Sequence, residues 1–279
     1  MSSAPLVSII VPTFNAGAHV GACLASLCSQ SLRALEVVVM DGASRDDTVD
    51  TVRRLAAEDP RIRLHSAPDR GLYDAMNQGV ARSRGDWVMF MGADDAFAAP
   101  DVLERLQPWL DDTVDLVYGD VFNVRRQARV GGPFSAERLM TETICHQAMV
   151  FRRGFFARTG EFDLRFRIAA DWDMNLRWYA AGARTRHVDL VVSRYSGTGL
   201  SAQSIDTEFE SCRLARIARY WGVPLWHPRL EACRFALREQ ALDDRRAGRR
   251  GRAALYYALY AWHSARARLR RPAAAHDGA

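Results

Sequence analysis

The sequence contains no lysine, so every basic side chain among its 279 residues is an arginine. Its five cysteines are scattered and form no CxxC pair, which predicts reduced thiols in a cytosolic compartment and no structural zinc site. No apolar run approaches the roughly 20 residues that a membrane-spanning helix needs. The start, MSSAPLVSIIVP, lacks the basic region of a signal peptide, and we therefore expect a cytoplasmic protein.

Two common nucleotide-binding motifs are missing as well. The loop after the first predicted strand has no GxGxxG, which argues against a dinucleotide fold with a pyrophosphate on the first helix. GxxxxGK[ST] is also absent, which argues against a P-loop. With 48% hydrophobic and 25% charged residues, the composition is that of an ordinary globular protein. The length allows one large domain or a domain with an appendage.

The net charge of +5 is distributed unevenly along the chain. The segment from Arg238 to Arg271 carries ten arginines and three acids, so it alone has a charge of +7 and the remainder sums to −2. The basic excess therefore belongs to the C-terminal segment.

Strand patterns alternate with helical patterns in the first half of the chain. Strands are expected at 6–12, 35–41, 61–66, 86–92 and 115–122, and helices at 17–30, 45–59, 71–83 and 98–110. This alternation predicts a parallel α/β sheet. Ser44, with Asp47 three residues on, is expected to cap the second helix.

From about residue 122 the alternation becomes less regular. A helix is expected from Asp171 to Gly182, a strand over 184–195, a flexible loop over 196–204, and helices thereafter. We therefore predict an α/β domain over residues 1–203, a helical extension over 204–271 and a disordered tail over 272–279.

Polar side chains follow three of the predicted strands. The first strand ends in Pro12–Asn15, the second in Asp41–Ser44 and the fourth in Asp94-Asp95. Ligands of parallel α/β sheets bind at the carboxyl ends of the strands. Two adjacent carboxylates repel each other unless a cation compensates them, and a divalent cation with oxygen ligands could also hold a diphosphate. Alternatively, Asp94 caps the next helix or lies in a solvated loop.

Five stretches, in this order, resemble family 2 glycosyltransferases with the GT-A fold: VSIIVPTFNAG, LEVVVMDGASRDDT, DRGLYDAMNQGVARSRGDWVMFMGADD, HQAMVFRRGFF and GEFDLRFRIAADWDMNLRWYAAG. The resemblance covers about residues 5 to 195. It implies an α/β fold, with a Rossmann-like sheet that has helices on both faces and is followed by the C-terminal helical extension. GLYDAMNQG resembles the branch that builds bacterial exopolysaccharide, O-antigen or colanic-acid-type units.

The resemblance implies an inverting glycosyltransferase that moves a sugar from a nucleotide-sugar, with UDP-sugar favoured, to a saccharide or lipid-linked saccharide. It implies a role in cell-surface polysaccharide synthesis. Asp41 would accept a hydrogen bond from the base, and Asn77 would brace the surrounding loops. The implied nucleotide-sugar-binding positions are Pro12, Thr13, Asn15, Asp41, Ser44, Asp69, Arg70, Gly71, Asp74, Asn77 and Asp94.

The resemblance also makes Asp94 and Asp95 the end of the DxD motif. Asp94 would face a divalent metal, Mn²⁺ or Mg²⁺, with Asp95 in support. Gly92 stands where the family often has an aspartate, so a metal-independent variant remains an alternative.

Asp171 matches the acid of the family's ED motif, with Ala170 in place of the glutamate. Inverting transfer needs a base that takes the proton of the attacking hydroxyl, and the resemblance assigns this role to Asp171. Asp173 is the alternative, but two residues further along a helix it would point about 200° away. Either acid could instead cap the helix.

His146 and Gln147 match an HQ pair of the same branch. They would contact the acceptor or the diphosphate, and His146 could bind the metal. The alternative is a hydrogen-bonded histidine at the start of a strand. Trp172 would stack on a sugar or form part of the core.

In the C-terminal segment, aromatic residues precede an arginine cluster. They are Tyr256, Tyr257, Tyr260 and Trp262, followed by Arg266, Arg268, Arg270 and Arg271. This pattern suits peripheral attachment to the anionic inner face of the cell membrane. The alternative is a soluble helical subdomain whose aromatic residues pack inward.

Other functions fit the sequence less well. No nucleic-acid-binding motif accompanies the basic segment, so no nucleic-acid partner is expected. A nucleotidyltransferase would show a glycine-rich basic signature after the first strand, and PTFNAGAHVG contains no basic residue other than a histidine. A catalytically silent nucleotide-sugar-binding scaffold remains the alternative to an enzyme.

Overall fold

A computed structural model describes residues 4–197 and 204–269 of the chain. The chain forms two compact units, one of Met1–Phe134 and Ile144–Asp206 and the other of Ser135–Thr143 and Thr207–Ala279. The second unit thus takes in a short segment from the middle of the sequence, which the sequence patterns did not suggest. Most of the predicted loop over 196–204 and the whole predicted tail over 272–279 lie outside the described residues.

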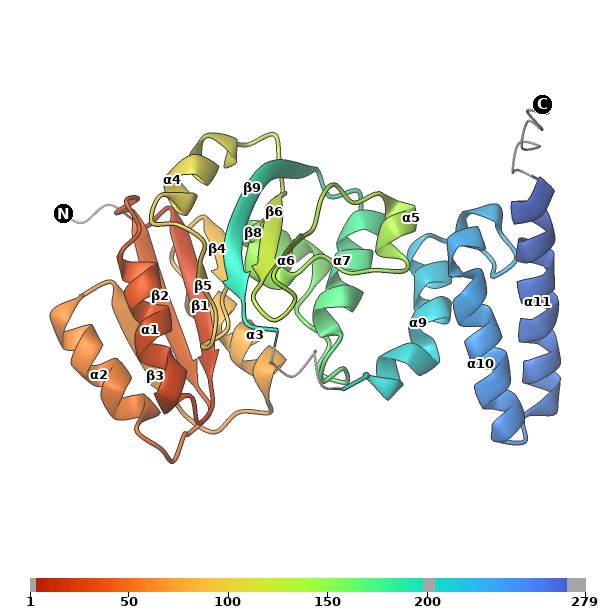
Figure 1. The fold of residues 1–279 in the computed structure, drawn as a ribbon, viewed down its shortest axis with the longest axis horizontal. Helices are drawn as coiled ribbons and strands as arrows, with labels where there is room; N and C mark the ends of the chain where they lie inside the picture. Colours follow the sequence, from red (N-terminus) through yellow and green to blue (C-terminus); the bar gives the residue numbers. More distant parts are fainter. Residues whose placement is uncertain (1–3, 198–203, 270–279) are drawn as a thin grey trace, which may run out of the picture. The chain divides into compact units, whose positions relative to one another are not determined.

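The first unit is built on a single sheet (Figure 1). Its strands are β1 (Val7–Thr13), β2 (Leu35–Asp41), β3 (Ile62–Ser66), β4 (Trp87–Phe90), β5 (Ala96–Phe97), β6 (Leu116–Asn123), β7 (Ala128–Val130), β8 (Met149–Arg152) and β9 (Thr185–Tyr195). The strand order is β3-β2-β1-β4-β8-β6-β9-β5, and β7 pairs with β6. The six strands predicted from sequence all form, each within two residues of the predicted ends.

The predicted parallel pairing holds for β1 to β4, and it places the ends of β1 and β2 side by side, with Thr13 opposite Asp41. Apolar side chains occupy both faces of these strands because helices cover both. Ile9 lies in one core with residues of α1 (Gly17–Cys28). On the other face α3 (Leu72–Arg82) approaches so closely that a Cβ at Gly79 would lie 2.4 Å from Ile10 Cγ2.

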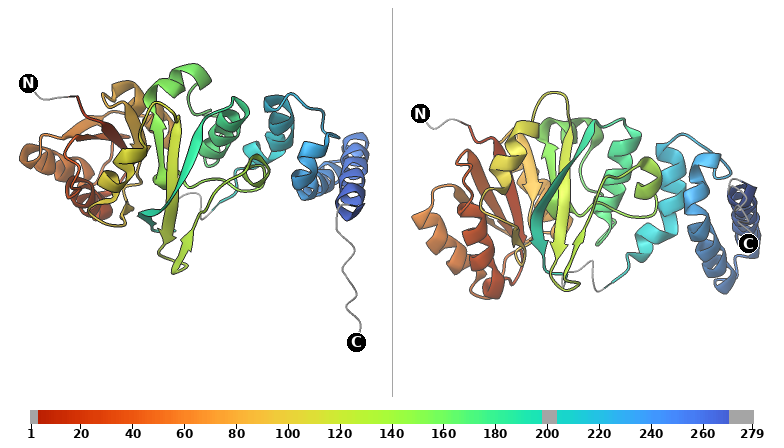
Figure 2. Two further views of the ribbon diagram at one scale, coloured as in Figure 1. Left: turned by 90° about the horizontal axis from the view of Figure 1, so that it is seen from above. Right: turned by 45° about the horizontal axis from the view of Figure 1, so that its top comes forward.

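Beyond β4 the sheet is mixed, because three strands that the sequence did not predict, β5, β7 and β8, run antiparallel to their neighbours. β8 runs antiparallel to both β4 and β6, whereas β6 and β9 are parallel (Figure 2). A parallel connection usually crosses over through a helix that packs on the sheet. Between β6 and β8 the chain has only β7, the short α5 (Ala136–Leu139) and the 3₁₀ turn η2 (His146–Ala148). It therefore returns in the opposite direction.

Two predicted helix starts differ from the structure. The second helix, α2 (Thr48–Glu58), is not capped by Ser44, because the Ser44 hydroxyl donates to Asp41 instead. Asp46 accepts from the Thr48 amide at 3.1 Å. The helix predicted over 98–110 is shortened to α4 (Val102–Leu106) and the 3₁₀ turn η1 (Gln107–Trp109). The remaining helices of this unit are α6 (Arg153–Thr159) and α7 (Ala170–Ala180).

The second unit is helical and contains α5, α9 (Thr207–Tyr220), η3 (Pro228–Cys233), α10 (Arg234–Arg246) and α11 (Arg250–Leu269). α10 and α11 lie side by side (Figures 1 and 2). The carboxylate of Asp244 is fully buried between them and pairs with Arg249 at 2.7 Å and Arg252 at 3.2 Å. Among the described helices, none has both the length and the hydropathy required to cross a bilayer.

Candidate active site

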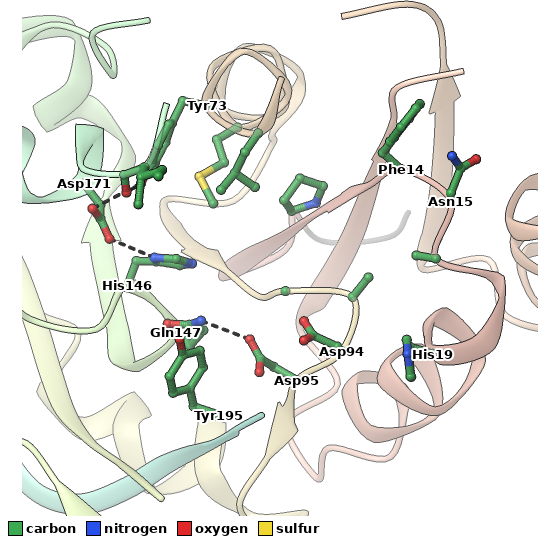
Figure 3. Close-up of a pocket in the computed structure, with 17 residues that line it drawn as sticks. Phe14, Asn15, His19, Tyr73, Asp94, Asp95, His146, Gln147, Asp171 and Tyr195 are labelled. Atoms are coloured by element: carbon green, nitrogen blue, oxygen red, sulfur yellow. Dashed lines mark hydrogen bonds and ion pairs between the residues drawn. The ribbon is translucent and has the colours of Figure 1, made fainter. Parts of the chain in front are cut away.

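A cavity of about 570 Å³ opens where the loops that follow β1 and β4 meet α3, η2 and the start of α7 (Figure 3). In the view of Figure 3, Asp171, Tyr73 and His146 lie on one side, and Phe14 and Asn15 on the other. The predicted site residues that line it are Pro12, Asn15, Asp94, Asp95, His146, Gln147 and Asp171. Tertiary structure thus brings together residues that lie up to 159 positions apart in the sequence.

The two adjacent carboxylates face different surroundings. Asp95 is buried, and its oxygens accept from the Gln147 side-chain amide at 3.0 Å and from the Ser196 backbone N–H at 2.9 Å. Asp94 accepts from the Ser196 hydroxyl at 2.7 Å. Ser196 therefore contacts both carboxylates and fixes the loop that follows β4.

Electrostatics separate the two acids further. Burial, together with the neighbouring charge of Asp94, raises the pKa of Asp95 above its ordinary value, although the hydrogen bonds from Ser196 and Gln147 act in the opposite direction. A cation at this loop would relieve the same repulsion. Both acids line the cavity, and both oxygens of Asp95 are held by donors of the protein itself.

Asp171, near the N-terminus of α7, has three polar neighbours. Its Oδ1 accepts from the Trp172 backbone N–H at 2.7 Å and lies 3.2 Å from the Tyr73 hydroxyl, which is closer, at 2.5 Å, to the Ile168 carbonyl oxygen. Its Oδ2 lies 3.0 Å from His146 Nδ1. The helix cap is Ala169, so Asp171 does not cap α7.

The two neighbours of Asp171 that the sequence singled out lie outside the cavity lining. Asp173 is fully buried, with Arg177 at 3.8 Å, which removes it from contact with a substrate in this cavity. Trp172 is half-buried and does not line the cavity either.

Asp41 lies at the centre of a second group. Its carboxylate accepts from the hydroxyls of Thr13 at 3.2 Å, Ser44 at 2.5 Å and Ser66 at 2.7 Å, and from the Ser44 N–H at 3.1 Å. Burial raises its pKa, but these donors outweigh burial, so the pKa lies below the ordinary value. A base N–H would have to displace one hydroxyl, and hydroxyl hydrogens rotate readily.

A smaller cavity of about 150 Å³ adjoins Asp41 and is also lined by Ser66 and Asp69. The loops around it are in close contact, since a Cβ at Gly42 would lie 2.8 Å from Asp69 Oδ2. Some predicted residues therefore line this smaller cavity, and others line the larger one.

The remaining predicted residues line neither cavity. Arg70 pairs with Asp74 at 2.9 Å. Gly71 adopts φ +110° as it leads into α3, a conformation that favours glycine. Asn77 exchanges two hydrogen bonds with the backbone of Phe162, at 3.0 Å and 2.9 Å, and so ties α3 to that loop.

Sequence reasoning missed four residues of the site. Tyr73 lies inside the quoted GLYDAMNQG motif, but its contact with Asp171 spans 98 positions. Phe14 and His19 line the cavity from the loop after β1 and from α1. Ser196 follows β9, where no local pattern points to the acids of β4.

The described residues include no group of three or more His, Cys, Asp or Glu side chains that could hold a metal ion. A divalent cation in a nucleotide site does not require such a cage, because one or two carboxylates, waters and substrate phosphates suffice. Asp94 fits that mode of binding. Both oxygens of Asp95 already accept hydrogen bonds, which suits support rather than direct coordination.

A mixed sheet with acids at its carboxyl edge, above a cavity closed by η2 and α7, is the arrangement of a GT-A nucleotide-sugar transferase. Residues 8–161 match the sequence profile described as glycosyl transferase family 2. The chain belongs to this family and is a glycosyltransferase.

Curated relatives agree with this family assignment. The chain is 41% identical over 213 residues to the "PGL/p-HBAD biosynthesis glycosyltransferase" of Mycobacterium tuberculosis, covering 74% of this chain and 83% of that protein. It is 28% identical over 214 residues to the chondroitin synthase of Pasteurella multocida, covering 73% of this chain and 22% of the synthase.

Solved structures confirm the GT-A fold. TarS of S. aureus, residues 1–349 in complex with UDP, aligns with a TM-score of 0.65 at 18% identity, covering 83% of this chain and 70% of that one. The mannosyltransferase PcManGT of Pyrobaculum calidifontis, in complex with GDP-Man and Mn²⁺, aligns with a TM-score of 0.62 at 22% identity. That alignment covers 93% of this chain and 76% of the other.

Proposed function

We propose that this glycosyltransferase inverts the anomeric centre of the sugar it transfers. The observation that carries the proposal is the larger cavity, which places Asp94 on one wall and the hydrogen-bonded pair of His146 and Asp171 on another. If the diphosphate of the donor lies at Asp94, the anomeric carbon of its sugar would face an acceptor hydroxyl bound next to His146 and Asp171. Direct displacement from the face opposite the leaving group needs one base and no carboxylate nucleophile.

The donor is a nucleoside diphosphate sugar, with UDP-sugar favoured. Asp41 and the smaller cavity would receive the base, because an ionised carboxylate accepts the N–H that uracil offers. Pro12 and Asn15 would lie along the nucleotide, on the loop that Thr13 and Ser44 tie to Asp41.

A divalent cation at Asp94, Mn²⁺ or Mg²⁺, would neutralise charge on the departing diphosphate. Asp95, Gln147 and Ser196 hold the Asp94 loop in place for it. The carboxylates of Asp95 and Asp94 lie so close to Gly92 that this loop leaves no room for an additional aspartate side chain at that position.

The acceptor is a saccharide or a lipid-linked saccharide of the cell surface. The relatives named for PGL/p-HBAD biosynthesis and for chondroitin synthesis support this class of product. Residues near 122–146 and 195–205 would select the acceptor, although 198–203 lie outside the described part of the chain.

Attachment to an anionic membrane by the second unit is part of the proposal. Exposed apolar side chains of this unit are Trp226, Phe235, Leu255, Trp262 and Leu269. Trp262 is 49% exposed and lies beneath the guanidinium of Arg266, 5.8 Å from the ring centroid. Aromatic residues beside arginines suit the interfacial region of an anionic leaflet.

The first test is nucleotide binding. Isothermal titration with UDP, GDP, dTDP and CMP, each with and without Mn²⁺ or Mg²⁺, is expected to give metal-dependent binding of UDP. Asp94→Asn should weaken it at least tenfold, whereas Asp50→Asn, an exposed acid on α2, should not change it.

Turnover is tested next by release of the nucleoside diphosphate. UDP-glucose, UDP-galactose, UDP-N-acetylglucosamine, GDP-mannose and dTDP-rhamnose serve as donors, with p-nitrophenyl glycosides as acceptors. An α-linked donor should give a β-linked product by NMR, and retention would contradict inversion. Nucleotide binding without turnover would favour a silent scaffold.

A further inference from the structure

His146 lies between Asp171 and the open part of the cavity (Figure 3). Asp171 Oδ1 accepts from the Trp172 N–H and lies near the Tyr73 hydroxyl, and Oδ2 lies 3.0 Å from His146 Nδ1. Each of the two side chains, His146 and Asp171, is only 14% exposed. Both side chains line the cavity, and His146 has a second ring nitrogen, Nε2, that Asp171 does not engage.

The hydrogen bonds define the tautomer of the histidine. Burial, and then the charge of Asp171, raise the pKa of Tyr73 well above its ordinary value, so its hydroxyl stays a donor. An ionised carboxylate only accepts hydrogen bonds, so His146 Nδ1 carries the proton that points to Asp171. In the neutral ring the lone pair is then on Nε2. Within the described residues, Nε2 has no hydrogen-bond partner, and the ring extends into the cavity.

We propose that His146 Nε2 takes the proton of the acceptor hydroxyl and that Asp171 is the positioning residue that orients the ring. This inference rests on the proposed inverting transfer. As the acceptor oxygen bonds to the anomeric carbon, the bond from that carbon to the diphosphate oxygen breaks and its electron pair leaves with the diphosphate. The hydroxyl proton moves to Nε2, and the imidazolium later releases it to water.

The charges around His146 favour this role. Asp171 faces Nδ1, and the charge of Asp95 is close enough to interact with that of His146. Both carboxylates would offer a counter-charge to a ring that has taken up a proton. Burial raises the pKa of the adjacent Cys145 to about 12, so that thiol stays neutral, while Arg126 opposes with its positive charge.

The test compares His146→Asn with Asp171→Asn. The asparagine amide can replace Nδ1–H as a donor to Asp171, but it has no basic nitrogen. We expect His146→Asn to bind UDP within about threefold of the wild type and to lose 10²- to 10⁴-fold in kcat, roughly the usual contribution of general base catalysis. The acid limb of the pH profile of kcat/KM should disappear in this variant.

Asp171→Asn should keep measurable transfer and should keep the acid limb that His146→Asn loses, because His146 still supplies the basic nitrogen. ¹⁵N NMR of the unliganded wild type should show one neutral histidine protonated at Nδ1 that is missing from His146→Asn. The matched control is His187→Gln, which alters a histidine paired with Asp120 at 2.9 Å outside the cavity. Its kcat and pH profile should equal those of the wild type.

Two results would overturn the assignment. If His146→Asn keeps its kcat and its acid limb while Asp171→Asn loses transfer, Asp171 is the base. If the NMR signal of His146 shows protonation at Nε2, the lone pair does not face the cavity. A wild type that releases no nucleoside diphosphate from any of the five donors would overturn the proposed function, and this inference with it.

Discussion

The carboxylate of Asp95 fills the space that a side chain at residue 92 would need. A Cβ at Gly92 would lie 2.6 Å from Asp95 Oδ2 and 3.1 Å from Asp94 Oδ1. Asp95 cannot easily move aside, because Gln147 and Ser196 hold both its oxygens. The glycine is therefore required by the packing of the loop.

Gly92→Ala is accordingly expected to lower the free energy of unfolding by about 1–3 kcal/mol, the usual cost of overpacking. It should also weaken metal-dependent UDP binding, because the Asp94 loop shifts. Urea denaturation and calorimetric titration measure the two effects.

Gly21→Ala is the matched control. Gly21 lies in α1, where an added Cβ would meet only Thr51 Cγ2 at an ordinary 3.7 Å. Alanine should therefore stabilise the helix by about 0.5–1 kcal/mol. Equal effects of the two substitutions would contradict the packing argument.

Asp95→Asn is expected to raise stability at neutral pH while reducing donor binding. Because burial and Asp94 raise the folded-state pKa of Asp95, its charged form destabilises the fold once the pH exceeds that pKa. The asparagine side chain carries no charge, so the substitution should raise the free energy of unfolding by about 1 kcal/mol. The gain over the wild type should appear at pH 7 and vanish below the ordinary range of aspartate. A variant that is less stable at pH 7 would show that the charge is fully compensated.

Asp41→Asn should weaken UDP binding by about tenfold, since a charged hydrogen-bond acceptor contributes roughly 1.5–3 kcal/mol. It should also destabilise the fold, because the loops after β1 and β2 meet at this carboxylate. The folded pKa of Asp41 is lowered, so this stability is present above the ordinary value of 3.8 and is lost as the pH falls through the folded pKa. Urea denaturation of the wild type and of Asp41→Asn at pH 7 and pH 3.5 measures how this stability difference depends on pH. An unchanged difference between wild type and variant at the two pH values would count against it.

Trp226→Ser combined with Trp262→Ser is expected to reduce co-sedimentation with phosphatidylglycerol liposomes by about tenfold, because exposed aromatic area contributes to interfacial binding. The indole of Trp262 donates to the Trp226 carbonyl at 3.1 Å, so the two residues form one exposed feature. Trp109→Ser, a 40% exposed tryptophan of the first unit, is the control. If the double variant binds the liposomes as well as the wild type does, this surface does not attach the protein to membranes.

The sequence by itself determined the strands, most of the helices and the edge of the sheet that carries the chemistry. Apolar runs that end in Asp41 or lead to Asp94 suffice for this, because strand formation and the carboxyl-edge rule depend on local pattern. The family motifs likewise identified Asp171 and His146 as residues of interest.

Only the tertiary structure decided which of those residues share a cavity and what each one contacts. The reversal at β8, the contact of Ser196 with both acids, and the hydrogen bonds from Tyr73 and His146 to Asp171 all join segments far apart in the chain. Local propensity contains no information about such pairs, because they form only when the sheet and helices pack. The burial that, together with the charge of Asp94, raises the pKa of Asp95 likewise exists only in the folded chain.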